Sequence, residues 1–272
     1  MTNVVVGAGS GMGIAVARKL APRGRLIIAD YNLAGVETLA AELGGDVTAV
    51  KCDITDQADI DALFAKVDDL EALVVTAGLS TSQAEGRRIL QVNLAGVAQL
   101  LKAAEPKLRE GTVGVCFASQ SGYLVPHVPE LFDVLDKPLE PDLLDRLDEF
   151  FEVDNRGLAY QASKRGVHRL ARNLAHTWGR KGARILSLSP GINDTPMNRG
   201  DEANNPEVMA KIIADSPLGR RGTPEEIANV VAFLTSPDAS YMTGSDVLVD
   251  GGMVTALPSY AWEGKLRAHQ PA

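Results

Sequence analysis

The sequence predicts an α/β fold: a doubly wound parallel sheet in a single domain. Short runs rich in β-branched residues alternate along the chain with longer helical patterns, and this alternation is typical of parallel sheets covered by helices. The short runs are continuously apolar, as are strands that are buried on both faces. A cluster of glycines joins the first run to the first helical pattern. With 272 residues the chain is long enough for one large domain or two small ones.

The predicted elements follow one another in a regular order. Strand, helix and strand repeat through the chain, so we expect right-handed crossovers and ligands bound at the carboxyl ends of the strands. The strands are expected at residues 4–6, 26–29, 47–50, 72–75, 113–117, 185–188 and 247–249, and the clearest helical patterns lie at residues 12–20, 33–43, 60–67 and 88–108.

Residues 123–155 interrupt this order. The apolar spacing in this segment predicts two amphipathic helices, separated near Pro138 and Pro141. The segment also carries many more acidic than basic residues. One interpretation is a solvated acidic face, and the other is a cap over a substrate cleft or a block on an assembly surface.

Composition and charge exclude several classes of function. The net charge of -8 argues against a nucleic-acid partner and against an anionic membrane surface. No apolar run approaches the roughly 18 residues of a membrane span, and the first strand starts too close to Met1 for a targeting segment. We therefore expect a soluble, cytoplasmic protein. Cys52 and Cys116 lie in apolar runs and are expected to be reduced, and the histidine spacing predicts no metal site.

The glycine cluster predicts a nucleotide-binding turn. It begins directly after the first predicted strand and leads into a helix, with the spacing G-x-x-x-G-x-G. Glycines let the backbone amides approach a pyrophosphate closely, and the helix adds the positive end of its dipole. A tight turn without a ligand is the alternative, but the strand before and the helix after favour a dinucleotide. The residues expected to bind it are Gly7, Ser10, Gly11, Met12 and Gly13.

The ends of the next strands supply the rest of this site. Asp30, followed by Tyr31, can accept hydrogen bonds from the adenosine ribose and would repel a 2′-phosphate, so we predict NAD(H) over NADP(H). Asp30 also suits the start of the following helix, and the two roles are compatible. Asp53, with Ile54, is placed to meet the adenine, or else to cap the next helix. The small residues of Thr76-Ala77-Gly78 permit close packing beneath the adenosine.

A tyrosine and a lysine predict the chemistry. Tyr160 and Lys164 are four residues apart, so on a helix they share one face. A nearby ammonium lowers the pKa of a phenol and makes it a general acid or base near working pH. Ser119, after the fifth predicted strand, can hold the reacting oxygen, or can be a simple serine turn. Asn93 lies in a long helical pattern, where it is either exposed or kinks the helix and holds a water.

These motifs, taken in order, resemble those of the short-chain dehydrogenase/reductase family. The resemblance runs from residue 4 to residue 252 and includes the glycine turn, Ala77-Gly78, Asn-x-x-Gly, the serine, Tyr-x-x-x-Lys and Pro190-Gly191. The sequence departs from the family at Val6, where threonine is common, and at Thr76, where asparagine is common. Both departures bear on fine cofactor contacts.

The resemblance implies a role for each matching residue. Tyr160 would exchange the substrate proton, Lys164 would bind the nicotinamide ribose, and Ser119 would position the substrate oxygen. Asn93 would hold a water in a proton relay from Lys164. The nicotinamide end of the cofactor would contact Pro190, Gly191, Ile192 and Thr195, and Ser121 is a second hydroxyl that ranks below Ser119.

The long spacing between Ser119 and Tyr160 is similar to that of a smaller group, the bacterial 3α-hydroxysteroid dehydrogenase/carbonyl reductases. Those enzymes carry a helical insertion at this point, which here corresponds to residues 123–155. The resemblance implies a bulky or cyclic alcohol or ketone as substrate. Because the insertion would obstruct one of the surfaces that build tetramers in the family, we predict a homodimer over a tetramer.

The substrate side is expected from a lid at residues 193–221 and from the tail after Gly252, with Met197, Met209, Leu257 and Trp262 as candidate lining residues. The favoured function is an NAD-dependent alcohol dehydrogenase or ketone reductase. One alternative is a dinucleotide-sensing regulator without turnover, although such a protein has no need of a proton relay. A ketoacyl reductase is the other, and those usually use NADP(H), which Asp30 disfavours.

Overall fold

The fold is described from a computed structural model for residues 1–204 and 206–256. Within these residues all seven strands are parallel and form one sheet in the order β3-β2-β1-β4-β5-β6-β7. Each predicted strand is present, and most are longer than predicted by a residue or two at an end. The strands are β1 (Thr2–Val6), β2 (Arg25–Asp30), β3 (Val47–Lys51), β4 (Leu70–Val75), β5 (Val113–Phe117), β6 (Arg184–Pro190) and β7 (Asp246–Val249).

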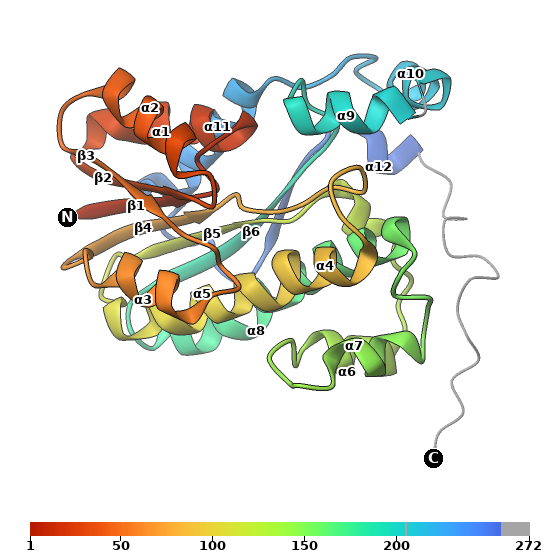
Figure 1. The fold of residues 1–272 in the computed structure, drawn as a ribbon, viewed down its shortest axis with the longest axis horizontal. Coiled ribbons are helices and arrows are strands. Elements are labelled where there is room, and N and C mark those ends of the chain that lie inside the picture. The colour runs from red at the N-terminus through yellow and green to blue at the C-terminus, as the bar shows by residue number, and fades with distance from the viewer. Residues whose placement is uncertain (205, 257–272) are drawn as a thin grey trace.

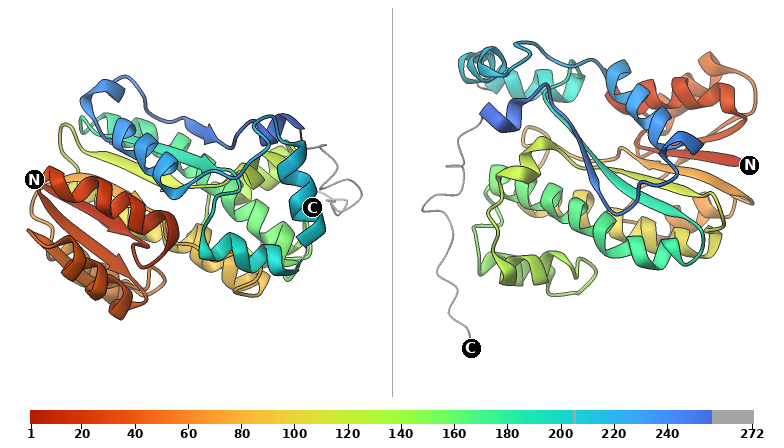
Figure 2. Two further views of the ribbon diagram at one scale, coloured as in Figure 1. Left: turned by 90° about the horizontal axis from the view of Figure 1, so that it is seen from above. Right: turned by 180° about the vertical axis from the view of Figure 1, so that it is seen from behind.

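Helices cover both faces of the sheet (Figures 1 and 2). One face carries α1 (Gly11–Leu20), α2 (Leu33–Leu43) and α11 (Pro224–Leu234). The other face carries α3 (Gln57–Phe64), α4 (Gly86–Leu90), α5 (Val97–Ala104) and the 24-residue helix α8 (Arg156–Gly179). Short 3₁₀ turns lie at η1 (Ala21–Arg23), η3 (Glu105–Lys107), η4 (Gln120–Leu124) and η5 (Pro237–Ala239). This is the doubly wound single domain that the sequence predicted.

The strand order fixes where a ligand can bind. The connections leave β1 toward β2 on one side, whereas β4 pairs with β1 on the other. Loops that leave the carboxyl ends of β1 and β4 therefore go to opposite faces and open a crevice between them. The glycine cluster follows β1 and Thr76 follows β4, so both lie at this crevice.

Two of the predicted helices have different limits in the structure. The pattern at residues 60–67 predicted a later start, but α3 begins at Gln57 because the Asp56 carboxylate accepts a hydrogen bond from the Ala58 amide at 2.8 Å. The pattern at residues 88–108 is not one uniform helix. A π-helical turn, η2 (Gln91–Gly96), separates α4 from α5, and the last turn becomes 3₁₀ at Pro106.

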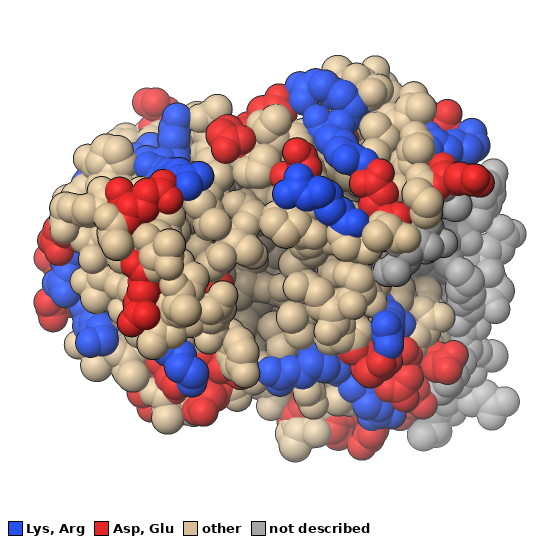
Figure 3. Space-filling view, turned by 45° about the horizontal axis from the view of Figure 1, so that its top comes forward, with Lys and Arg blue, Asp and Glu red and all other residues tan. Residues whose placement is uncertain are grey.

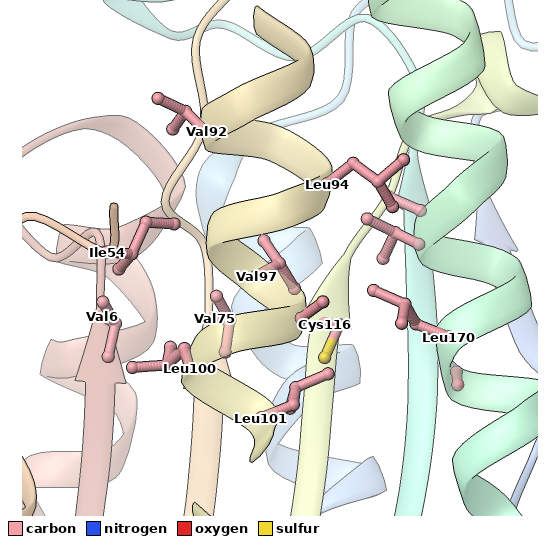
Figure 4. Close-up of a cluster of buried hydrophobic side chains, with 14 of the residues drawn as sticks. Val6, Ile54, Val75, Val92, Leu94, Val97, Leu100, Leu101, Cys116 and Leu170 are labelled. Atoms are coloured by element: carbon pink, nitrogen blue, oxygen red, sulfur yellow. The ribbon is translucent and has the colours of Figure 1, made fainter. Parts of the chain in front are cut away.

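Apolar side chains from the strands and helices meet in a dense core (Figure 4). Val6 and Val75 project from β1 and β4, and Leu94, Leu100 and Leu170 of the helices on one face belong to the same buried cluster. All five are buried. The wide turn η2 is therefore held by packing on one side, which fixes where its polar residue Asn93 points.

Residues 123–155 contain two short helices, α6 (Pro129–Leu135) and α7 (Leu143–Asp148). They pack beneath α8 on the side away from the sheet (Figure 1). Their apolar residues are buried and join the core of that layer, and these are Leu131, Leu135, Leu147 and Phe151 among others. Pro138 and Pro141 lie between the two helices.

Beyond the carboxyl ends of the strands lie α9 (Pro196–Asn204), α10 (Pro206–Asp215) and α12 (Met253–Ala256) (Figure 1). In the part of the chain that the structure describes, none of the helices has the length and apolar character that crossing a membrane requires. Cys52 and Cys116 are both free and buried.

Candidate active site

The turn between β1 and α1 is built so that only glycine fits at key points. Gly7 has φ +92°, a left-handed value that favours glycine. A Cβ atom on Gly13 would lie 2.0 Å from the Gly7 carbonyl oxygen, so the first turn of α1 packs directly on the loop. The Ser10 side chain does not cap α1. The Gly13 amide donates to the Ser10 carbonyl at 3.1 Å, so the amides of Gly11 and Met12 at the start of the helix are the ones that can bind an anion, and the turn fits a pyrophosphate.

Asp30 is fixed at the end of β2 by two backbone amides. Its Oδ2 accepts a hydrogen bond from the Gly9 amide at 2.8 Å, and its Oδ1 accepts one from the Asn32 amide at 2.8 Å. A Cβ atom on Gly9 would lie 2.7 Å from the Asp30 carboxyl carbon. Each carboxylate oxygen keeps a further acceptor position. The carboxylate is therefore held against the glycine turn and can still accept a hydroxyl.

Asp53 occupies the corresponding position after β3. Its Oδ1 accepts hydrogen bonds from the amide and the hydroxyl of Thr55 at 2.9 and 2.7 Å, and the Arg88 guanidinium lies 3.5 Å from Oδ2. Burial alone would raise the pKa of Asp53, but the Thr55 hydrogen bonds and Arg88 outweigh it and lower the pKa. Asp53 is thus a fixed anionic acceptor, and it does not cap α3, which Asp56 caps.

Thr76 explains one departure from the family pattern. Its hydroxyl lies 2.9 Å from the Gly7 carbonyl and 3.0 Å from the Val6 carbonyl, both of which accept its hydrogen bond. The end of β4 is therefore tied to the glycine turn by a side chain. The threonine at this position thus links the end of β4 to the turn that follows β1.

These features surround one cleft with a volume of about 730 Å³. The face shown in Figure 3 is hollowed at its centre, and the residues around the hollow are mostly uncharged. Of the predicted cofactor residues, the cleft is lined by Gly7, Ser10, Gly11, Met12, Gly13, Asp30, Tyr31, Asp53, Ile54, Thr76, Ala77, Gly78 and Thr195. A second hollow of about 760 Å³ lies between α3 and α5 and is lined by none of the predicted site residues, so the first is the candidate cofactor cleft.

Of the predicted cofactor residues, three do not line the cleft: Pro190, Gly191 and Ile192. The four predicted catalytic residues, Asn93, Ser119, Tyr160 and Lys164, do not line it either. The Gly191 amide donates to the Val249 carbonyl at 2.9 Å, and a Cβ atom there would meet the Asp250 backbone at 2.6 Å. This stretch is held against β7. Its contact with the nicotinamide end stays a prediction.

The structure also shows lining residues that the sequence did not reveal. They come from the loop after β4, from α4, from η2 and from α9: Leu79, Ser82, Gln83, Ala84, Arg88, Val92, Pro196 and Gly200, together with Cys52. Met197, which the sequence predicted as a candidate lining residue, also lines the cleft. The start of α9 closes one side of the cleft within the predicted lid. The predicted tail is described only to Ala256, and Leu257 and Trp262 lie outside the described residues.

Asn93 is buried in the π-helical turn, and its side chain holds the loop after β4. Its Oδ1 accepts from the Leu79 amide at 2.7 Å, and its Nδ2 donates to the Leu79 carbonyl at 2.9 Å. Both amide groups of the side chain are satisfied by one residue. Asn93 is buried in a π-helical turn, so of the two alternatives for this residue the exposed position is excluded.

Lys164 of α8 lies beside the cleft wall. Its Nζ donates to the Phe117 carbonyl at the end of β5, at 3.0 Å, and lies 5.7 Å from the centroid of the Tyr160 ring. A Cβ atom on Gly78, which lines the cleft, would lie 3.4 Å from Lys164 Nζ and 3.3 Å from Asn93 Oδ1. Burial lowers the pKa of Lys164 to about 8, so the amine is still mostly protonated at neutral pH.

Ser119 and α8 complete the group. The Asn155 side chain caps α8 by accepting a hydrogen bond from the Leu158 amide. The helix therefore begins about one turn before Tyr160. Ser119 is buried, and its Oγ accepts from the Ser121 amide at 3.1 Å. This contact leaves the hydroxyl proton of Ser119 to donate elsewhere. In the described part of the chain no cluster of His, Cys, Asp and Glu has the arrangement of a metal site.

A parallel sheet with a glycine turn at its switch point, and a buried lysine beside a tyrosine, defines a nicotinamide-dinucleotide oxidoreductase. Comparison with known proteins gives the family. Residues 2–127 match the short chain dehydrogenase family, and residues 150–254 match the family described as enoyl-(acyl carrier protein) reductase. The chain belongs to the short-chain dehydrogenase/reductase family, as the sequence indicated.

Individual relatives match over nearly the whole chain. The cis-4-hydroxycyclohexanecarboxylate dehydrogenase of Sinomonas cyclohexanicum is 32% identical, over 92% of this chain and 94% of that one. The 3-alpha-hydroxysteroid dehydrogenase/carbonyl reductase of Comamonas testosteroni is 29% identical, over 92% and 95%. The crystal structure of BdcA in complex with NADPH superposes with a TM-score of 0.73 at 25% identity, over 92% and 93%.

Proposed function

We propose that this protein is an NAD(H)-dependent oxidoreductase that interconverts a secondary alcohol and the corresponding ketone, with Tyr160 as the acid/base. The observation that carries the proposal is the position of the Lys164 ammonium. It is fixed by the Phe117 carbonyl between the Tyr160 ring and Gly78 at the cleft. A charge in that place stabilises the phenolate form of Tyr160 beside a bound dinucleotide.

Each group of the site has a distinct task. Tyr160 gives its proton to the ketone oxygen during reduction and takes it back during oxidation. Ser119 donates its free hydroxyl proton to the same oxygen and holds it in place, since its Oγ is anchored by Ser121. The nicotinamide, when bound, supplies or accepts the hydride.

Lys164 and Asn93 would serve proton movement and binding. The Lys164 ammonium binds the nicotinamide ribose as well as acting on Tyr160, because it faces Gly78 in the cleft wall. Asn93 shapes the π-helical turn where a relay water would sit. Thr195 lines the cleft near its lid side and, with Pro190, Gly191 and Ile192, would contact the nicotinamide end.

The preference for NAD(H) rests on Asp30. Its carboxylate is held by the Gly9 and Asn32 amides at the place where β2 ends, and it retains acceptor capacity for a ribose hydroxyl. A 2′-phosphate there would meet a fixed negative charge. One structural relative binds NADPH, so the cofactor must be measured on this protein.

We propose a bulky or cyclic alcohol or ketone as substrate. The relatives named above act on a hydroxycyclohexane carboxylate and on hydroxysteroids. In this chain α9 and the residues up to 221 would form a lid, since Pro196, Met197 and Gly200 already line the cleft. The lid is the part in which substrate choice would reside.

The test is turnover measured by NADH absorbance against a panel of cyclic and steroid ketones and alcohols. We expect Tyr160→Phe to bind NADH as the wild type does and to lose about 10²–10⁴-fold in kcat, because only the proton donor is removed. Tyr241→Phe is the matched control, since Tyr241 is fully exposed, and it should keep wild-type turnover.

Equal turnover of wild type and Tyr160→Phe would remove Tyr160 from the mechanism. A wild-type protein that binds NADH tightly but reduces no ketone would instead favour the dinucleotide-sensing alternative. A ketoacyl thioester in the panel, offered with NADPH, tests the ketoacyl-reductase alternative.

A further inference from the structure

A largely buried polar cluster, whose one tyrosine is 38% exposed, lies on the side of α8 that faces β6 and β7. We call it the Asp246 network, and its members are Tyr123, His168, Ser187, Ser189 and Asp246. It lies outside the cofactor cleft, and none of its members belongs to the proposed catalytic group.

The Asp246 carboxylate is the centre of this network. Its Oδ1 accepts hydrogen bonds from the hydroxyls of Ser187 at 2.6 Å and Ser189 at 3.0 Å, and its Oδ2 accepts one from Tyr123 at 2.8 Å. The Asp246 side chain is only 11% exposed. Hydrogen bonds to a sheltered carboxylate are among the stronger ones in proteins, so these contacts hold their donors firmly.

His168 extends the network to the catalytic helix. Its Nε2 lies 2.7 Å from Ser189 Oγ and 3.5 Å from Asp246 Oδ1. Because Ser189 gives its single proton to Asp246, we assign the Nε2 proton to His168 and the acceptor role to Ser189. Serine and aspartate thus face the same ring nitrogen, and this is not the arrangement of a hydrolytic triad, in which they face different ones. Burial lowers the pKa of His168 to about 4, so the ring is neutral at pH 7.

The network joins the segments that carry the proposed catalytic residues. His168 lies on α8 one turn after Lys164. Tyr123 belongs to η4, the short helix that starts immediately after Ser119 and whose Ser121 amide holds Ser119 Oγ. Both segments meet the same carboxylate on β7.

The contact between η4 and α8 leaves no spare room. A Cβ atom on Gly122 would lie 2.8 Å from His168 Cε1 and 3.0 Å from the Arg165 amide nitrogen. The Tyr123 ring covers His168 from the next position, with the ring centroids 5.0 Å apart. The backbone after Ser119 is therefore seated directly on the helix, and the Tyr123 hydroxyl is what fastens it to β7.

We propose that Tyr123, through its hydrogen bond to Asp246, is a positioning residue that keeps Ser119 aligned with Tyr160 and Lys164. This inference rests on the proposed function of that group. Loss of the hydroxyl frees η4 from β7 and lets Ser119 Oγ drift from the substrate oxygen. Turnover falls as a result, whereas dinucleotide affinity does not change, because the cleft is lined by other segments.

The test compares two variants that each remove one hydrogen bond to the same carboxylate. Tyr123→Phe keeps the ring against His168 and loses the link to η4. Ser187→Ala loses the bond from within β6, which does not lead to η4. We expect similar losses of thermal stability, NADH affinity within about two-fold of wild type in both, and a kcat about ten-fold lower in Tyr123→Phe alone.

Amide hydrogen exchange gives a readout that does not depend on turnover. The Ser121 and Gly122 amides should exchange faster in Tyr123→Phe than in Ser187→Ala or the wild type. Equal exchange in the two variants, or equal kcat in both, would overturn the positioning role. If Tyr160→Phe loses turnover and Tyr123→Phe does not, this inference fails and the proposed function stands. A wild-type protein without turnover would contradict the proposed function. The exchange rates of the Ser121 and Gly122 amides would then be the test of whether Tyr123 positions the segment after Ser119.

Discussion

Lys164 carries a charge in a place where burial penalises charge. The amine lies at the end of β5, where its hydrogen bond to the Phe117 carbonyl offsets only part of the loss of water. Burial lowers its pKa from 10.5 to about 8. A residue that costs stability and is still held in place by the fold points to a functional requirement.

The lowered pKa of Lys164 predicts that the stability of the protein depends on pH. Between pH 8 and 10.5 the unfolded chain keeps the Lys164 proton and the folded chain does not, so the free energy of unfolding attributable to Lys164 rises with pH. Relative to Lys164→Met, the wild type should gain about 2 kcal/mol between pH 7 and pH 10. Urea unfolding of both proteins at the two pH values measures the difference. A difference that stays constant with pH would contradict the buried charge.

Asp30 gives the second prediction at this scale. Wild-type kcat/KM should be about 10–100-fold higher with NADH than with NADPH, the range of one or two charged hydrogen bonds. Asp30→Asn keeps an acceptor for one of the two amides but removes the charge, so it should bind NADPH better and NADH worse. Steady-state kinetics with both cofactors measures this. Tighter binding of NADPH than NADH by the wild type would refute the assignment.

Residues at strand ends were the predictable part of the site. Asp30, Asp53 and Thr76 each follow an apolar run, and the ends of parallel strands meet at one edge, so a sequence pattern was enough to bring them together. Arg88 and Ser82 were missed for a physical reason. They lie on a loop and a helix start whose path is set by packing against α8 and by the Asn93 side chain, which no local pattern encodes.

At the scale of elements, the segment 123–155 behaves as part of the folded core. Phe132 on α6 is buried, and its ring lies under the guanidinium groups of Arg165 and Arg169 of α8, 4.9 and 4.4 Å from the ring centroid. Asp136 adds an ion pair with Arg169. None of its residues lines the 730 Å³ cleft. The other acidic residues of the segment are mostly exposed, around an apolar contact with α8.

We therefore expect Phe132→Ala to destabilise the protein by about 3 kcal/mol, as the loss of a buried aromatic ring usually does. Asp133→Ala is the matched control on the same helix, because Asp133 is exposed, and it should change stability by about 0.5 kcal/mol or less. Chemical unfolding measures both. Similar small effects in the two variants would show that α6 is not bound firmly to α8.

Element limits were less predictable than element types. All seven strands could be read from continuous apolar runs. The start of α3 depended on Asp56, one of several acids that could cap a helix there, and the π-helical turn between α4 and α5 leaves no mark in apolar periodicity. The start of α3 and the position of the π-helical turn both depend on which local hydrogen bonds form. The pattern of hydrophobic residues carries no information about these hydrogen bonds.

At the scale of the whole molecule, α6 and α7 cover part of the outer side of α8 (Figures 1 and 2). A helix face that is already covered is not available to pair with a second chain. We therefore keep the prediction of a homodimer over a tetramer. Light scattering coupled to size exclusion should give twice the chain mass of 28.9 kDa over a range of concentrations. A mass of four chains would contradict it.

The amide of Asn93 and the backbone of Leu79 face each other as two peptide groups do in a sheet, each giving one proton and taking one. The loop after β4 is thereby joined to η2 by a pair of hydrogen bonds of the same kind as those between neighbouring strands. An aspartate at position 93, such as slow deamidation would create, has no proton to offer the Leu79 carbonyl and brings two oxygens face to face. Deamidation of this single side chain would therefore weaken the attachment of the loop between the cleft and Lys164, while the hydrogen bonds of the sheet would stay intact.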